Sequence, residues 1–125
     1  MKFTFNKKDR LKSQKVIDKL FLEGKTVTSF PLKLIYLKTE FSDGQRIKAG
    51  VTVSKRNFKK AVDRNRIKRL LRESYRLNRD PYFNNISTSY ALMILYIGGE
   101  QTDFDTINSH FKILLSNFIE KISRD

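Results

Sequence analysis

The feature that most constrains this chain is a strongly basic stretch at residues 55–79, which reads as one long helix. It holds 11 of the 26 lysines and arginines but only two acids, Asp63 and Glu73, so eleven minus two gives nine of the 13 net positive charges. Residues 80–125 instead sum to −3, from three basic and six acidic side chains. No proline interrupts the stretch, and good helix formers dominate from Lys60 onward. Charge concentrated on one element is typical of a protein that binds a polyanion.

The predicted helix is amphipathic. At about 100° per residue, a polar arc and an apolar arc lie on opposite sides of its axis. The polar arc carries Lys68, Arg72, Asn65, Arg76 and Arg69. The apolar arc carries Leu77, Leu70, Ser74, Ile67, Leu71 and Tyr75. Arginine outnumbers lysine on the polar arc, which favours bidentate contact with phosphates. The alternative is a basic face that meets only solvent. However, no ladder of glutamate–lysine pairs neutralises this face, so its charges repel one another unless a partner compensates them.

The composition of the whole chain bounds its class. We expect one domain spanning residues 1–125, because 125 residues with 39% hydrophobic content support a single core. Residues 1–8 are a candidate for a flexible basic arm. Cysteine is absent, which excludes disulfides and thiolate metal sites and fits a reducing compartment. The N-terminus has no apolar region of signal-peptide length, and the longest apolar run, 90–97, is far shorter than a membrane span. We therefore expect a soluble, cytoplasmic protein.

The first half of the chain is predicted to form a helix and two strands. A short helix at 13–23 begins with a serine N-cap, and Gly24 stands where such a helix ends. Leucine, isoleucine, tyrosine and threonine fill residues 29–41, which indicates a strand. A turn signal at 42–45 precedes a second strand with alternating polarity at 47–54. We expect these two strands to pair as an antiparallel hairpin with one face toward a helix.

The second half is predicted to alternate helix, strand and helix. The basic helix runs from about 60 to 78 and stops before Pro81. Residues 80–87 are expected to be an irregular link, and 89–97 a compact strand. A last helix is expected after an N-cap at Thr102, with an acidic residue at its third position. The element order is αββαβα, an α+β, two-layer sandwich of helices on one small sheet.

The sequence offers no self-contained catalytic site. His110, the only histidine, has no serine and aspartate partners suggested by the sequence. Asp103 and Asp105 are better explained as favourable charges at a helix N-terminus. There is no carboxylate cluster for two metal ions and no histidine pair. We therefore expect the protein itself to hold no catalytic residue, metal site or bound cofactor.

Alternate positions of the two predicted strands offer a small, mildly polar and positive sheet face. These positions are Lys33, Ile35, Thr52 and Ser54. Ile17 and Phe21 stand one turn apart on the first helix and are candidates for the wall of the same groove. Ordinary core packing is the other interpretation of this pair. Flat apolar groups beside a cationic helix suit unstacked, single-stranded RNA.

Two motifs and their spacing resemble the bacterial ribonuclease P protein subunit. The first is the Arg-Asn-Arg helix at 61–73, which reads Ala-Val-Asp-Arg-Asn-Arg-Ile-Lys-Arg-Leu-Leu-Arg-Glu. Before it, Gly-Val-Thr-Val-Ser-Lys-Arg at 50–56 is similar to the family's Val-Ser-Lys-Lys-like segment. The early Arg-Leu-Lys at 10–12, followed by a helix with a phenylalanine, also matches. The resemblance covers essentially residues 5–122.

This resemblance implies a fold and a function. The fold would be α+β, like domain 2 of ribosomal protein S5, with a left-handed βαβ crossover, although right-handed crossovers are the general rule. The function would be that of a protein subunit of ribonuclease P, a ribonucleoprotein endonuclease that removes the 5′ leader from precursor tRNA. In the family the catalytic RNA subunit holds the metal ions. Mg²⁺ is therefore expected in the holoenzyme, the protein alone is expected to be non-catalytic, and we expect a 1:1 complex of protein and RNA.

The family's binding roles, carried onto this chain, fall into two groups. The leader-binding cleft would comprise Ile17, Phe21, Lys33, Ile35, Thr52, Arg64, Lys68 and Arg72. Contact with the catalytic RNA would involve Ser54, Lys55, Arg56, Asn65, Arg66 and Arg69. At Ile17, Lys33 and Ile35 the family often has other aromatic or apolar residues, so we expect weaker stacking and stronger phosphate attraction here. Residues 57–58 form an apparent insertion between the two motifs.

Two other binding classes compete with this hypothesis. A ribosomal or general RNA-binding module would share the basic helix but have no enzymatic assembly. A DNA-binding protein would need a recognition helix with asparagine or glutamine positioned for base edges. Here the polar arc is nearly all arginine and lysine, which position phosphates and read little sequence. The ribonuclease P subunit is our leading hypothesis.

Overall fold

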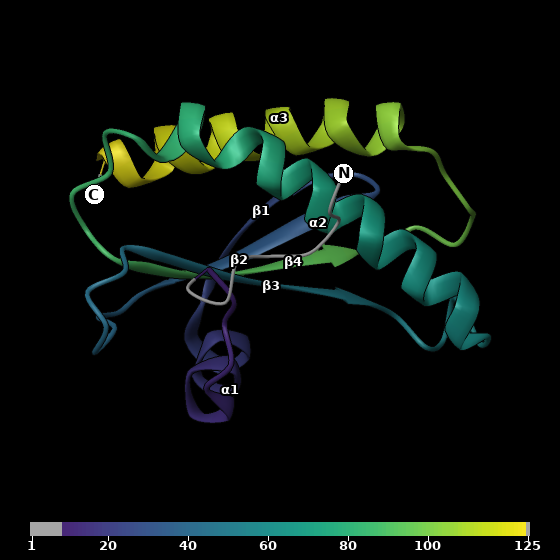
Figure 1. The fold of residues 1–125 in the computed structure, drawn as a ribbon, viewed down its shortest axis with the longest axis horizontal. Coiled ribbons are helices and arrows are strands. Elements are labelled where there is room, and N and C mark those ends of the chain that lie inside the picture. Colours follow the sequence, from purple (N-terminus) through teal and green to yellow (C-terminus); the bar gives the residue numbers. More distant parts are fainter. Residues whose placement is uncertain (1–8, 125) are drawn as a thin grey trace.

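The computed structural model describes residues 9–124, so the predicted arm at 1–8 lies outside the described residues. Within the described residues, the chain forms three helices and four strands in one α+β unit. They are α1 (Gln14–Glu23), β1 (Lys25–Ser29), β2 (Leu32–Lys38), β3 (Ile47–Val53), α2 (Ala61–Phe83), β4 (Tyr90–Tyr96) and α3 (Phe104–Arg124). Helices α2 and α3 cover one face of the sheet, and α1 lies alone under the other (Figure 1). The α+β class is confirmed, with one strand more than expected and with α1 on the face opposite the other helices.

The strand order is β1-β2-β4-β3, so the predicted hairpin between residues 29–41 and 47–54 is wrong. The antiparallel hairpin is instead β1–β2, joined by the two-residue turn Phe30–Pro31. Strand β4 lies between β2 and β3, antiparallel to the first and parallel to the second. The reason is burial: β4 reads Tyr-Ala-Leu-Met-Ile-Leu-Tyr and is apolar on both faces. A strand of this kind is best placed at the centre of a sheet, covered on both sides.

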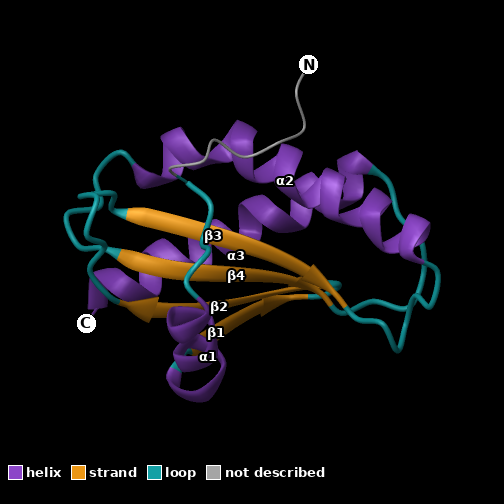
Figure 2. Cartoon of the chain, turned by 60° about the horizontal axis from the view of Figure 1, so that its bottom comes forward, coloured by secondary structure: helices purple, strands orange, loops and turns teal. Residues whose placement is uncertain are grey.

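The connection from β3 through α2 to β4 is left-handed. In Figure 2 the parallel strands β3 and β4 point the same way and β4 lies below β3, with α1 in front of the sheet. Helix α2, which joins them, lies on the side opposite α1, that is, behind the sheet in this view (Figure 1). The hand that the family resemblance implied is therefore confirmed, against the general preference for right-handed crossovers.

Two apolar clusters hold the layers together. The larger lies between the sheet and helices α2 and α3, and it includes interlocked aromatic rings at Tyr36, Tyr90 and Phe118. The smaller lies between the sheet and α1 and comprises Leu11, Leu20, Ile35, Ala91 and Met93, with half-buried neighbours around it. Strands β2 and β4 carry apolar residues on both faces, and they therefore contribute to both clusters.

Helix α1 begins and ends where the sequence predicts, but its final glycine has a different reason. The Ser13 hydroxyl accepts a hydrogen bond from the Val16 N–H, as expected of an N-cap. Gly24 has an extended backbone, with φ −65° and ψ 150°, so no left-handed conformation requires it. A Cβ there would lie 2.5 Å from Ile35 Cγ2 and 2.4 Å from the Leu20 carbonyl oxygen. Glycine is needed because the helix end approaches β2 closely.

Helices α2 and α3 differ from expectation at one end each. Helix α2 continues through Pro81 to Phe83. Pro81 has no N–H to donate to the Leu77 carbonyl, but Leu77 is exposed, so water can solvate that one carbonyl and the helix tolerates the proline in its last turn. Helix α3 is capped by Asp103, whose carboxylate accepts the Thr106 N–H at 2.8 Å. The predicted cap, Thr102, instead uses its carbonyl to accept a bond from Arg66.

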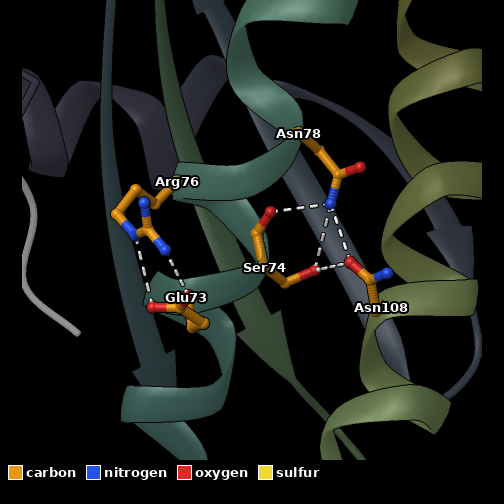
Figure 3. Close-up of polar contacts among 5 residues, drawn as sticks. All are labelled: Glu73, Ser74, Arg76, Asn78 and Asn108. Carbon is orange, nitrogen blue, oxygen red and sulfur yellow. Dashed lines mark hydrogen bonds and ion pairs between the residues drawn. The ribbon is translucent and has the colours of Figure 1, made fainter. Parts of the chain in front are cut away.

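A buried polar group joins α2 to α3 (Figure 3). The Ser74 hydroxyl and the Asn78 side-chain amide each donate to Oδ1 of Asn108, both at 2.8 Å. Asn78 also donates to the Ser74 carbonyl at 2.7 Å. On the same helix, Arg76 donates to the Glu73 carboxylate. These bonds fix the rotation of α2, and with it the direction of the basic face.

Candidate nucleic-acid interface

Three half-buried residues form a row across the α1-facing side of the sheet. The pairing places Lys33 of β2 beside Leu95 of β4, and Leu95 beside Thr52 of β3. We call Lys33, Leu95 and Thr52 the floor row. The next row, Ile35, Met93 and Gly50, lies nearer the part of the sheet that α1 covers.

Helix α1 contributes the two predicted apolar side chains in different ways. Ile17 is half-buried and packs against the cluster that contains Ile35. Ile35 itself is only 7% exposed, so it supports the site from below and offers little surface. Phe21 is 51% exposed and free to contact a ligand. Of the predicted apolar cleft residues, only Phe21 therefore presents a large surface.

The predicted leader-binding cations lie along the outer edge of β3. Arg79, on the same side of α2, pairs with Asp9 at 2.8 Å, and the Asp9 carbonyl accepts the Ala49 N–H of β3. Ser74, on another side of α2, bonds to α3. At about 100° per residue, the side of α2 that faces the outer edge of β3, where the segment 9–11 pairs with Ala49, is the side that carries Arg64, Lys68 and Arg72. All three are half-buried, and we call them the inner ridge.

Arg72 is an uncompensated cation. Partial burial, followed by the charges of Arg10 and Arg69, lowers the pKa of its guanidinium. Within residues 9–124 it has no ion-pair partner. The side chain stays charged at neutral pH, so its environment favours the approach of an anion.

Arg64 has a second role that sequence reasoning missed. Its guanidinium donates to the carbonyl oxygens of Phe58 at 2.7 Å and Lys59 at 2.9 Å. In the same loop, the Asn57 side chain donates to the carbonyls of Ile97 and Gly98. The apparent insertion at 57–58 is therefore a clip that fixes the β3–α2 loop to the end of β4. Buried Phe58, packed on Tyr96, was the available signal.

The residues predicted to contact the catalytic RNA are all exposed. Asn65, Arg66 and Arg69 form the outer ridge of α2. Ser54, Lys55 and Arg56 lie in the loop before it, where the Ser54 hydroxyl accepts the Arg56 N–H. Lys59 and Lys60 are two further exposed cations of this loop that our prediction did not include. Arg66 is not wholly free, because it donates to Gln101 at 2.8 Å and to the Thr102 carbonyl at 2.7 Å.

The described residues give little support to other chemistry. Between residues 9 and 124, no three histidine, cysteine or carboxylate side chains cluster as a metal site would require. His110 Nδ1 lies 3.0 Å from the Ser29 hydroxyl, a contact that the sequence did not suggest. No helix in this part of the chain has both the length and the apolar character needed to cross a membrane.

Comparison with known proteins identifies the family. Residues 5–118 match the family described as Ribonuclease P. The ribonuclease P protein component of Porphyromonas gingivalis is 34% identical over 109 residues, covering 84% of this chain and 79% of that protein. The component of Chlorobium phaeobacteroides is 32% identical over 127 residues, covering 91% and 87%.

Solved structures of bacterial ribonuclease P proteins have the same fold. The Thermotoga maritima protein superposes with a TM-score of 0.67 at 23% identity, covering 86% of this chain and 96% of that one. The Staphylococcus aureus protein gives 0.68 at 17% identity, covering 86% and 93%. The chain belongs to the ribonuclease P protein family, the protein component of the RNA-containing endoribonuclease that removes the 5′ leader of precursor tRNA.

Proposed function

We propose that the two ridges of α2 bind different RNAs in a 1:1 ribonucleoprotein that works in the cytoplasm. The inner ridge, the floor row and Phe21 bind the single-stranded 5′ leader. The outer ridge and the loop at 54–60 bind the catalytic RNA subunit. The observation that carries this proposal is the contrast between the ridges, since the inner one is half-buried beside a strand edge and the outer one is exposed.

The inner site suits a single strand better than a duplex. Its cations are half-buried beside β3, and the apolar surfaces of the proposed site are the half-buried Leu95 of β4 and the exposed Phe21 of α1. An unpaired nucleotide can turn its base onto such surfaces while its phosphate meets an arginine or lysine. A helical RNA presents its phosphates outside and its bases stacked inside, so it would reach the cations without using the apolar surfaces.

The outer site suits a large, structured RNA. Asn65 and Arg69 have no side-chain hydrogen bond or ion pair within the described residues, and Lys55, Arg56, Lys59 and Lys60 project from a loop that Arg64 and Asn57 hold in place. Because the loop backbone is already held, only the cationic side chains lose conformational freedom when they meet phosphates, which favours binding. We assign the Mg²⁺ ions of the holoenzyme to the RNA subunit and give the protein a binding role without a catalytic residue.

The test is to separate the ridges in reconstituted holoenzyme. Arg72→Ala should weaken the binding of precursor tRNA by about fivefold or more, as expected for the loss of a partly desolvated charged contact. The affinity for mature tRNA, which lacks the leader, should change little. Arg69→Ala should instead weaken assembly with the RNA subunit and affect both tRNAs alike. Lys112→Ala, which removes an exposed cation from α3, is the matched control. Equal effects of Arg72→Ala and Arg69→Ala on assembly and on leader affinity would overturn the division.

A further inference from the structure

Only two aromatic side chains are exposed among the described residues. They are Phe21, at 51%, and Phe30, at 67%. Phe21 belongs to the predicted leader site, but Phe30 has no role in anything described above. It occupies the first position of the turn between β1 and β2, at the end of the sheet where β3 and β4 also finish.

Three loops meet at this end of the sheet. The Ile97 N–H, just after β4, donates to the Pro31 carbonyl at 2.8 Å. Asn57, just after β3, donates to the carbonyls of Ile97 and Gly98 at 3.3 and 3.2 Å. The Phe30 turn is therefore linked through the end of β4 to the loop that carries the exposed cations at 55–60.

The turn that carries Phe30 is firmly held. Ser29 and Leu32 pair directly across its base. A Cβ on Gly98 would lie 2.9 Å from Pro31 Cβ, so the neighbouring loop packs tightly against the turn. A ring on a fixed support loses little freedom when a base stacks on it, which is the condition for an effective stacking surface.

The floor row lies between this turn and the part of the sheet under α1. Lys33 is the second residue of β2 after the turn. Ile35, in the cluster beneath α1, is two residues further along the strand. Ile35 is five residues from Phe30, so at about 3.4 Å per residue Phe30 lies up to about 17 Å from the α1-covered row. Phe21 stands on α1, whereas Phe30 stands at the end of the sheet beyond the floor row, so we expect the two rings to meet different nucleotides of one strand.

We propose that Phe30 is a stacking platform for one base of the single-stranded leader, at the far side of the floor row from α1. Single exposed apolar residues are common on protein surfaces and by themselves mean little. Phe30 differs because its turn is firmly held, is linked through the end of β4 to the loop that carries exposed cations, and leads directly into the strand that contributes Lys33 to the floor row. This inference rests on the proposed leader site and extends it by one nucleotide position.

The test is a binding cycle between Phe30 and individual leader bases in reconstituted holoenzyme. Precursor tRNAs carrying one abasic site at successive leader positions are compared with the intact leader. For the unmodified protein, we expect an abasic site at one position beyond those sensed by Phe21 to cost about fivefold in affinity, the lower end of a base–aromatic stack. Phe30→Ala should cost the same with the intact leader and show no further loss at that position.

The outcomes separate this inference from the function on which it rests. If Phe21→Ala and Arg72→Ala respond to leader changes but Phe30→Ala binds every substrate like the unmodified protein, the Phe30 assignment is overturned. If none of the three responds to the leader, the leader site itself fails. Phe30→Tyr should retain the coupling. Should Phe30→Ala fail to fold, Phe30→Leu keeps an apolar side chain without a π-face and is judged by the same cycle.

Discussion

The junction between α2 and α3 provides the sharpest test of how the basic face is oriented. In Asn108→Ala, the Ser74 hydroxyl loses its acceptor, whereas Asn78 keeps the Ser74 carbonyl at 2.7 Å. One orphaned donor on a fully buried residue costs about 2 kcal/mol. Alanine offsets about 0.5 kcal/mol of this through its higher helix propensity. The expected net loss is about 1.5 kcal/mol, or about 5 °C in Tm for a domain of this size.

The measurement is urea unfolding followed by circular dichroism, with a double-mutant cycle. Ser74→Ala removes the donor that Asn108→Ala would orphan, so adding Asn108→Ala to it should cost about 2 kcal/mol less than Asn108→Ala alone. Lys112→Ala, exposed on the same helix, is the control and should leave stability within about 0.5 kcal/mol of the starting value. Additive effects of the two substitutions would refute the reasoning, because they would show that the shared hydrogen bond contributes nothing beyond its separate ends.

Three further outcomes follow from the charges on this chain. Lys68→Ala should reduce the slope of log K against log salt for leader binding by about 0.7, the value for one phosphate contact on a single strand, as measured by fluorescence anisotropy across a salt series. Arg72→Gln should raise the urea midpoint of the free protein, because it removes a half-buried cation repelled by Arg10 and Arg69, while it weakens precursor tRNA binding. The Thr106 N–H lowers the pKa of Asp103 below 3.8, so its stabilising effect is present above that pH and lost as pH falls through the folded-state pKa; Asp103→Asn should flatten that part of the stability–pH curve.

The sequence predicted the helices well and the sheet poorly, for a physical reason. Caps and 3.6-residue periodicity are local, so α1 and the start of α3 were located within a residue or two. Strand partners are chosen by tertiary burial, which local patterns do not encode. The order of elements along the chain suggested pairing 29–41 with 47–54, but the doubly apolar β4 takes the central place between them. Strand β1 was missed because its threonines and serine resemble a loop.

The predicted site residues nevertheless fall together. Side chains in a strand alternate, so Lys33, Ile35 and Thr52 share a face whether their strands pair directly or through β4. Inserting β4 between them moves Thr52 one strand further away and adds Leu95 to the floor. The prediction of a shared face depended on the alternation of side chains along each strand, which the structure confirms. It did not depend on direct pairing of the two strands, which the structure contradicts. Phe30 could not be assigned in this way, because it lies in a turn, where side chains do not alternate between the two faces of a sheet.

The structure divides the cations of α2 by what already binds them. Arg64 holds the preceding loop, Arg66 holds the segment before α3, and Arg79 pairs with Asp9. Lys68, Arg69 and Arg72 have no hydrogen-bonded or ion-paired partner within residues 9–124. A count of charges along the sequence therefore overstates the number of phosphates that the helix can neutralise. The engaged arginines keep the helix and its loops in position, and the free cations between them provide the electrostatic attraction for RNA.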